Sequence, residues 1–325
     1  MSLTYLARSQ NLPIKEFEKQ YKDHLSDYHS WNQKDHADKW ILVENNLGPN
    51  LSIDEVAVTK GELYTIVTNK AAKGGKGSLV AIAADTKAAD IISVLTKIPE
   101  PKRNTVKEVT LDMSNAMDAI IRMSFPNASI VTDRFHVQQL VSEAVQEIRM
   151  MVRREAMKEE TAAILQAKKD NKPYTPKLYE NGDTKKQLLA RSFYLLFKSK
   201  NNWTPSQKIR PEILFKEFPN IEHAYNLSMM FRSFYEKNTN RDQAKENLQK
   251  WYQKIQEENL ESFIVVAESI KVQEDTILNY FNHRSTNASA ESFNAKLKGF
   301  RALVRGVRDV KFFLFRVGKI YGNIG

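Results

Sequence analysis

Two acidic residues in this 325-residue chain occur in surroundings that favour metal chemistry. Asp54 lies within one β-branched run and Asp112 at the end of another, and apolar residues flank both. A carboxylate among apolar neighbours is costly to bury unless a cation or a polar partner compensates. Carboxylate oxygens are ligands that Mg²⁺ and Mn²⁺ prefer. The pair indicates a site for a hard divalent cation, although each acid alone also fits a strand-end or helix-capping role.

A third acid, Glu291, belongs to a polar stripe on a predicted helix. Asn287, Glu291, Asn294 and Lys298 follow one another at intervals of four, three and four residues, so they share one helical face. Spacing leaves two alternatives open. Glu291 is either a third metal ligand, or a solvated surface acid on a helix that Asn287 caps.

Further polar residues neighbour these acids. Glu55 directly follows Asp54, and the two-residue period of a strand points them to opposite faces. Asp133 and His136 lie at the end of the last predicted strand, which is expected next to the strand of Asp112. Asp133 is therefore a rival of Asp112 as the second metal ligand. A single histidine such as His136 fits a hydrogen-bonded structural residue as well as a catalytic one.

The elements that must position these acids follow from the hydrophobic pattern. β-branched, partly alternating runs predict strands, and intervening segments with helical spacing predict crossover helices. Three successive strands followed by two helix–strand units give the order βββαβαβ, an α/β fold with a mixed sheet. The predicted strands cover residues 51–60, 62–70, 77–85, 107–114 and 128–135, with a turn near Gly61 and helices at 86–97 and before 125. Adjacent parallel strands would then bring Asp54 and Asp112 to one crevice.

The rest of the chain is predicted to be helical. Residues 1–48 have helical spacing and form a small leader, and residues 49–136 hold the sheet. Residues 137–284 show no strand pattern, so they form a large all-helical insertion between the fifth strand and the helix of Glu291. Residues 285–325 contain that helix and a basic C-terminal helix.

Composition narrows the classes of function. Lys and Arg number 49 against 39 Asp and Glu, a net charge of +10 that favours an anionic partner such as nucleic acid. The chain has no cysteine, which excludes disulfide scaffolds, cysteine zinc modules and thiol nucleophiles. No apolar run is long enough for a signal peptide or a membrane span, so we expect a cytoplasmic protein.

Basic residues gather beside the predicted acidic site. Residues 296–319 contain eight of them against the single acid Asp309. Such a stripe can neutralise DNA phosphates with little dependence on sequence, although a solvated helix face explains it too. The predicted DNA-binding residues are Lys296, Lys298, Arg301, Arg305, Arg308 and Lys311, with a second patch at Arg149 and Arg153 on the first insertion helix.

From about residue 15 to its end, the chain resembles the ISL-three group of bacterial insertion-sequence transposases. The resemblance rests on an ordered set of motifs rather than on any one of them. These motifs are Ser52-Ile53-Asp54-Glu55, Leu111-Asp112-Met113-Ser114, Asp133-Arg134-Phe135-His136-Val137, and Thr286-Asn287 followed by Glu291, Asn294 and Lys298.

The resemblance implies an RNase H-like catalytic domain with an Asp-Asp-Glu triad of Asp54, Asp112 and Glu291. These residues would hold two Mg²⁺ or Mn²⁺ ions for cleavage of double-stranded DNA at transposon ends and strand transfer into a target. A homo-oligomer on DNA, associated with the nucleoid when active, is expected. A nuclease or resolvase that cuts without joining, and a non-catalytic DNA-binding relic, remain alternatives. Longer members of the group carry a cysteine-rich zinc module and a helix-turn-helix, so a separate polypeptide is a candidate for end recognition.

Overall fold

The computed structural model describes residues 3–58, 62–304 and 306–324. The chain divides into two compact units, one formed by Met1–Asp133 with Arg284–Gly325 and the other by Arg134–His283. None of the helices in the described ranges combines the length and apolarity that a membrane span requires.

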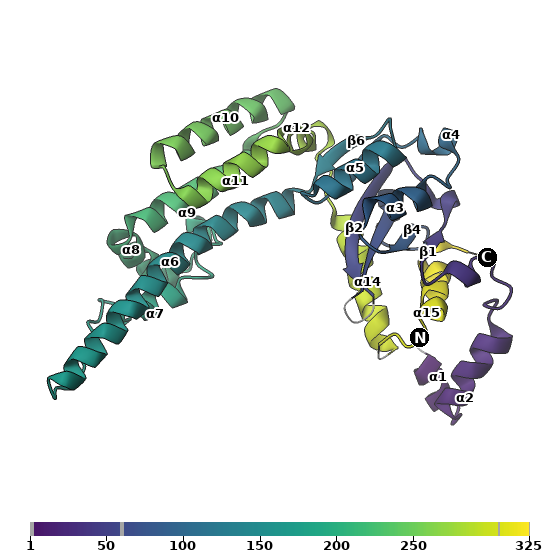
Figure 1. The fold of residues 1–325 in the computed structure, drawn as a ribbon, viewed down its shortest axis with the longest axis horizontal. Helices are drawn as coiled ribbons and strands as arrows, with labels where there is room; N and C mark the ends of the chain where they lie inside the picture. Colours follow the sequence, from purple (N-terminus) through teal and green to yellow (C-terminus); the bar gives the residue numbers. More distant parts are fainter. Residues whose placement is uncertain (1–2, 59–61, 305, 325) are drawn as a thin grey trace. The chain divides into compact units, whose positions relative to one another are not determined.

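The first unit is built on a six-stranded mixed sheet with the order β1-β4-β3-β2-β5-β6 (Figure 1). The pairs β1–β4, β4–β3 and β3–β2 are antiparallel, whereas β2, β5 and β6 run parallel to one another. The strands are β1 (Trp40–Leu42), β2 (Asn50–Ala57), β3 (Leu63–Asn69), β4 (Leu79–Ala84), β5 (Glu108–Leu111) and β6 (Ser129–Thr132). The predicted mixed α/β fold is therefore confirmed.

Helices cover both faces of this sheet. On one face, α3 (Ala88–Leu95), α4 (Glu100–Arg103) and α5 (Asn115–Ser124) follow strands, and Ile91 and Ile120 of α3 and α5 join a core with Leu51 and Val109. The opposite face is covered by α14 (Ala288–Leu303) and α15 (Val310–Val317), whose Phe293 and Phe315 belong to a second core. Each face thus buries the apolar residues of alternate strand positions.

The N-terminal segment differs from the expected helical leader. It contains α1 (Leu3–Ser9) and α2 (Ile14–Gln20), but it also supplies the edge strand β1, which pairs with β4. Tyr28 and Trp31 pack against Phe315 of α15, so the segment contributes to the second core. A three-residue strand is too short to show a period in sequence, which is why β1 was missed. The predicted turn near Gly61 lies outside the described residues.

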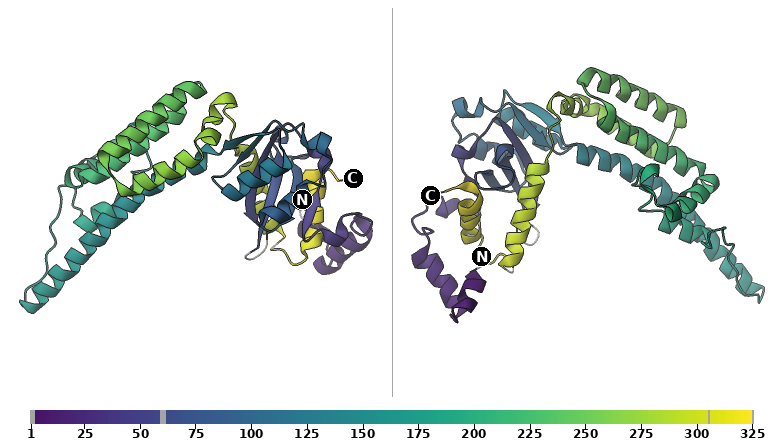
Figure 2. Two further views of the ribbon diagram at one scale, coloured as in Figure 1. Left: turned by 45° about the horizontal axis from the view of Figure 1, so that its top comes forward. Right: turned by 180° about the vertical axis from the view of Figure 1, so that it is seen from behind.

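The regular elements of the second unit are helices, and two of its loop residues, Leu178 and Thr184, form an isolated β-bridge. Its longest helix, α6 (Arg134–Lys169), runs beside α9 (Pro219–Lys237) and α11 (Glu261–Val272), as both views in Figure 2 show. An aromatic cluster around Phe231, Trp251 and Tyr235 fills its core. The remaining helices are α7 (Lys185–Arg191), α8 (Pro205–Glu217), α10 (Arg241–Glu258), α12 (Glu274–Leu278) and α13 (Tyr280–His283).

Candidate active site

Three aspartates lie on the parallel strands of the sheet or directly after them. The ladder of β2 and β5 ends at the pair Ser52–Thr110, and Asp54 and Asp112 each follow it by two residues. The ladder of β5 and β6 ends at the pair Leu111–Thr132, directly before Asp112 and Asp133, and the Asp133 amide donates to the carbonyl of Leu111 at 2.7 Å. Asp112 and Asp133 therefore lie together where β5 and β6 end, whereas Asp54 lies within β2, three residues before that strand ends.

Asp54 is held in place by two hydrogen bonds. The backbone amide of Glu55 donates to its Oδ1 at 2.8 Å, and Nδ2 of Asn294 on α14 donates to its Oδ2 at 2.6 Å. Asn294 is buried, and its neighbours Phe293 and Leu297 anchor α14 in the core. The sequence therefore positions Asp54 twice, once through its own strand and once through a helix 240 residues later.

The loop after β3 approaches α14 closely enough to require glycine. Gly74 has a φ of 71°, and a Cβ there would lie 2.8 Å from Oγ of Ser292. Its carbonyl accepts a hydrogen bond from Nζ of Lys296 at 2.8 Å. A side chain at Gly74 would be strained by its backbone angle and would push against α14. This contact fixes the helix that carries Asn294 and Glu291.

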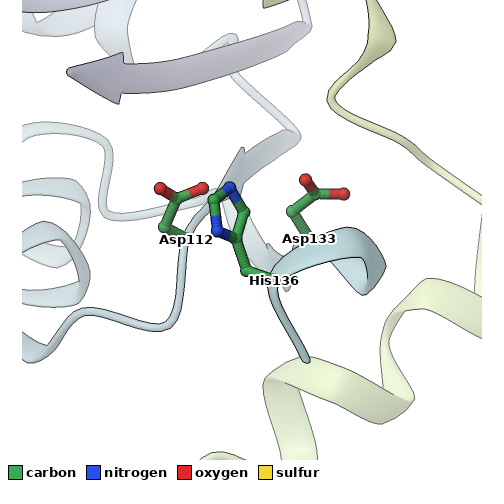
Figure 3. A group of neighbouring side chains, drawn as sticks. All are labelled: Asp112, Asp133 and His136. Atoms are coloured by element: carbon green, nitrogen blue, oxygen red, sulfur yellow. The ribbon is translucent and has the colours of Figure 1, made fainter. Parts of the chain in front are cut away.

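Asp112, Asp133 and His136 form a cluster with the composition of a metal site. One ligand atom from each lies within 4.8 Å of the others, and Figure 3 shows the three side chains gathered where β5 and β6 end. His136 follows Asp133 by one helical turn, because α6 begins at Arg134 directly after β6. Two carboxylates and an imidazole suit divalent cations such as Mn²⁺, and the carboxylates alone suit Mg²⁺. The donor set therefore fits the expected metal.

The Asp112 carboxylate interacts electrostatically with Glu55. Partial burial of the Glu55 carboxyl raises its pKa, and the negative charge of Asp112 raises it further. The register places Glu55 opposite Thr65, on the other face of β2 from Asp54, as the strand period requires. Acidic groups thus approach Asp112 from two directions, a field that attracts cations.

Glu291 lies in the first turn of α14 and is exposed to solvent. It precedes Asn294 by three residues, so it lies about one helical turn from the residue that binds Asp54. Neither Glu291 nor Asp54 belongs to the cluster of Asp112, Asp133 and His136. The structure thus places Glu291 on the helix that contacts Asp54, and its role as a ligand stays a prediction.

Asn287 occupies the N-cap position of α14, but its side chain makes no capping hydrogen bond. It is only 2 % exposed, and among the described residues its Oδ1 finds no hydrogen-bond partner. A buried amide oxygen without a partner is uncommon in folded proteins. The capping role considered for Asn287 is therefore wrong.

A partly buried lysine, Lys70, was missed by sequence reasoning. Nζ of Lys70, just after β3, donates to Glu108 at 3.2 Å and to the hydroxyl of Thr110. Burial lowers the pKa of Lys70, and the charges of Glu108 and Asp133 oppose that shift. Glu108, Thr110 and Asp112 alternate along β5, so they share one face. This alternation of polar residues in an apolar strand was the available signal.

The predicted phosphate-binding residues from Lys296 to Lys311 divide into two groups. Arg301 donates to the carbonyl of Ala57 at 3.1 Å. Lys311 donates to the carbonyl of Asp35 at 2.5 Å and lies 3.4 Å from the Asp38 carboxylate. With Lys296, these residues tie elements of the unit together.

Two other basic residues of the segment 296–319 stay available to contact a phosphate. Lys298 and Arg308 are exposed, and within the described ranges neither forms an ion pair. Arg305 lies outside the described residues. These two side chains are therefore the cations of the stripe that are best placed for a phosphate.

The second predicted basic patch is different in character. Arg149 is buried, donates to Gln146 and to the carbonyl of Leu189, and lies 5.2 Å from the ring centre of Phe193. Arg153 is half-buried, and its Nε is enclosed. The expectation of a surface patch is corrected here, because Arg149 serves the internal packing of α6 and α7.

Comparison with known proteins places the chain in a family. A family model described as a transposase, of the ISL3 type, matches residues 51–317 and so spans β2, the aspartates, the helical unit, α14 and α15. The chain belongs to the ISL3 family of transposases. A curated relative is the transposase for insertion sequence element IS1001 of Bordetella parapertussis, 20 % identical over 271 residues. The match covers 82 % of this chain and 59 % of that transposase, so the chain spans less than two thirds of the relative's length.

Proposed function

We propose that this ISL3 transposase chain cleaves DNA strands at the ends of an insertion sequence and joins them to a target. The observation that supports the proposal is that Asp54 lies on β2 and Asp112 directly follows its parallel neighbour β5, while Asn294 of α14, one turn after Glu291, is hydrogen-bonded to Asp54. Three antiparallel strands followed by two parallel crossovers support an RNase H-like fold for this unit.

The proposed ligands are Asp54, Asp112 and Glu291, with Asp133 as the rival of Asp112. The cluster that Asp112 and Asp133 form with His136 supports a divalent metal centre at this edge of the sheet. A divalent cation bound there would favour ionisation of the attacking hydroxyl and offset charge on the leaving oxygen. Mg²⁺ or Mn²⁺ fits these oxygen donors, and two ions are expected.

The chain's own residues supply position and charge. Asn294 and the Glu55 amide restrict the rotation of the Asp54 carboxylate, which reduces the entropy lost when it binds a ligand. Lys298 lies one helical turn after Asn294 on the same face, where an exposed cation can bind a phosphate of the DNA. We propose that double-stranded DNA approaches along α14.

Substitution of the three acids tests this proposal. Asp54→Asn, Asp112→Asn and Glu291→Gln are each expected to reduce Mn²⁺-dependent cleavage by more than about 100-fold, because each removes an anionic ligand. The substrate is a plasmid that carries the DNA flanking this chain's own gene. Asp90→Asn, an exposed acid of α3, is the matched control and should cleave at the parent rate.

The outcomes separate the alternatives. Joining of cut ends to a second plasmid supports a transposase, and cutting without joining indicates a nuclease or resolvase. DNA binding without either activity indicates a relic. Parent-like cleavage by the Asp112→Asn variant, together with loss of cleavage in Asp133→Asn, would replace Asp112 by Asp133 in the proposed ligand set.

A further inference from the structure

One face of α6 forms a continuous stripe along most of the helix. Leu140, Glu147, Arg154, Thr161 and Lys168 recur every seven residues. Ala144, Met151, Lys158 and Leu165 form a second row with the same interval, offset by four. Rows with offsets of three and four residues lie side by side on a helix and form one continuous stripe. From Leu140 to Lys168 the stripe spans 29 residues, about 42 Å at the rise of an α-helix.

The charges of this stripe change sign along the helix. Glu143 and Glu147 make its first half acidic, whereas Lys158, Lys168 and Lys169 make its second half basic. None of these five side chains forms an ion pair within the described ranges. Two acids of the second half, Glu159 and Glu160, lie on the opposite side of the helix and pair with Lys185 and Lys186 of α7.

The acidic half borders an apolar groove within the helical unit. The groove has a volume of about 860 Å³ and lies between α6 and the start of α11. Ala144, Ile148 and Val266 are its buried apolar residues, while Met151 and Val265 are 51 % and 59 % exposed. Among the described residues, Glu143, Glu147, Glu155 and Glu261 line the groove against the single cation Arg154, so its charged lining is acidic overall. Such a groove suits a helix that presents apolar and basic side chains.

The basic half of α6 is itself a helix of that kind. Its last buried residue is Ala156, and beyond it Met157, Ile164 and Leu165 are 41 %, 43 % and 56 % exposed. Figures 1 and 2 show these final turns extending past α7 and α8 of the same unit. The segment thus offers exposed apolar side chains together with Lys158 and Lys168.

We propose that α6 pairs antiparallel with α6 of a second copy of this chain, so that each basic half lies in the acidic groove of the other. A two-fold axis near Arg154 brings Met157 level with Met151 of the second copy. The same axis brings Lys168 near Glu143 and Lys158 near Glu147. The contact is self-complementary and therefore occurs twice, as an isologous interface requires. A second copy fits the groove because the groove is acidic overall and the end of α6 is basic.

Charge exchange tests this pairing in DNA-free protein by sedimentation equilibrium. The acidic-half variant Glu143→Lys/Glu147→Lys and the basic-half variant Lys158→Glu/Lys168→Glu should each raise the dimer dissociation constant at least about tenfold, because like charges then face each other. The variant with all four changes should regain the parent dissociation constant, because opposite charges face each other again.

Two single variants complete the design. Leu165→Glu should also weaken the dimer at least about tenfold, since it places a charge in the apolar contact. Val272→Glu, at the exposed end of α11, is the matched control and should leave the dissociation constant unchanged. Circular dichroism verifies that every variant stays helical. A parent chain that stays monomeric, or a four-fold variant that stays as weak as the two-fold ones, would overturn the pairing.

Discussion

At the scale of single residues, the hydrogen bond between Asn294 and Asp54 is the most consequential contact of the site. It joins a helix to a strand over 240 residues of sequence, and both partners are at least partly buried. An amide donor suits this position because it restrains the carboxylate without supplying a competing positive charge. A lysine in its place would form an ion pair and oppose cation binding.

Replacement of Asn294 should therefore affect activity more than stability. Asn294→Ala is expected to lower Mn²⁺-dependent cleavage about 10- to 100-fold, the usual cost of losing a partner that orients a ligating carboxylate. Loss of one hydrogen bond should reduce the free energy of unfolding by only about 1–2 kcal/mol. Cleavage rates and urea unfolding of the same preparations measure the two effects.

Ser292→Ala on the same helical turn serves as the control for this prediction. Its side chain lies beside Gly74 and makes no hydrogen bond to Asp54. It should cleave at the parent rate. An Asn294→Ala protein with parent activity would show that Asp54 needs no restraint from α14.

At the scale of elements, Asp183 is the polar centre of the helical unit. It is fully buried and binds Arg191 of α7 and Arg210 of α8, the latter at 2.7 Å. Burial acts to raise the pKa of Asp183, but the hydrogen bonds and charges of the two arginines outweigh it and keep the pKa below its usual value. A depressed pKa means that the ionised form stabilises the fold.

The pH dependence of this stabilisation has a defined sign. The contribution of Asp183 should be fully present above the unfolded pKa of about 4, and it should disappear as the pH falls through the lower folded value. Asp183→Asn should cost about 3 kcal/mol at pH 7, the low end for a broken buried pair, because Arg191 is half exposed. Its unfolding should depend less on pH below 4.

Denaturant unfolding at pH 7 and pH 3 measures this effect. Asp170→Asn, an exposed acid just after α6, is the control and should retain the parent stability. Equal unfolding free energies for Asp183→Asn and the parent at pH 7 would contradict the assigned role.

Elements that rest on local pattern were predictable, and contacts between distant segments were not. β2, β5 and β6 appeared in the sequence as β-branched runs, and their order placed the strand that carries Asp54 beside the strand that precedes Asp112. The three residues of β1 carry no period, and only pairing with β4 makes them a strand. Lys70 reaches Glu108 across 38 residues, and Arg149 is buried by its contact with Leu189 of α7. Local rules give no information on such packing.

At the scale of the whole molecule, the net charge of +10 matters less than where the cations are free. Arg149 is buried between α6 and α7, and Lys311 forms an ion pair with Asp38, so neither contributes fully to DNA affinity. Lys298 and Arg308 remain exposed in the unit that holds the aspartates. Cations that touch phosphate release bound counterions, and this makes affinity depend on salt.

The salt dependence of DNA affinity therefore measures how many phosphates the chain contacts. Lys298→Gln and Arg308→Gln should each reduce the slope of log affinity against log salt by about 1, and should do so equally on unrelated duplexes. Lys107→Gln, before the amino end of β5 and thus at the opposite end of the strand from Asp112, should leave the slope unchanged. Fluorescence anisotropy with a labelled duplex at several salt concentrations gives these slopes. An unchanged slope for Lys298→Gln would remove α14 from the DNA path, and with it the proposal that DNA reaches Asp54 along this helix.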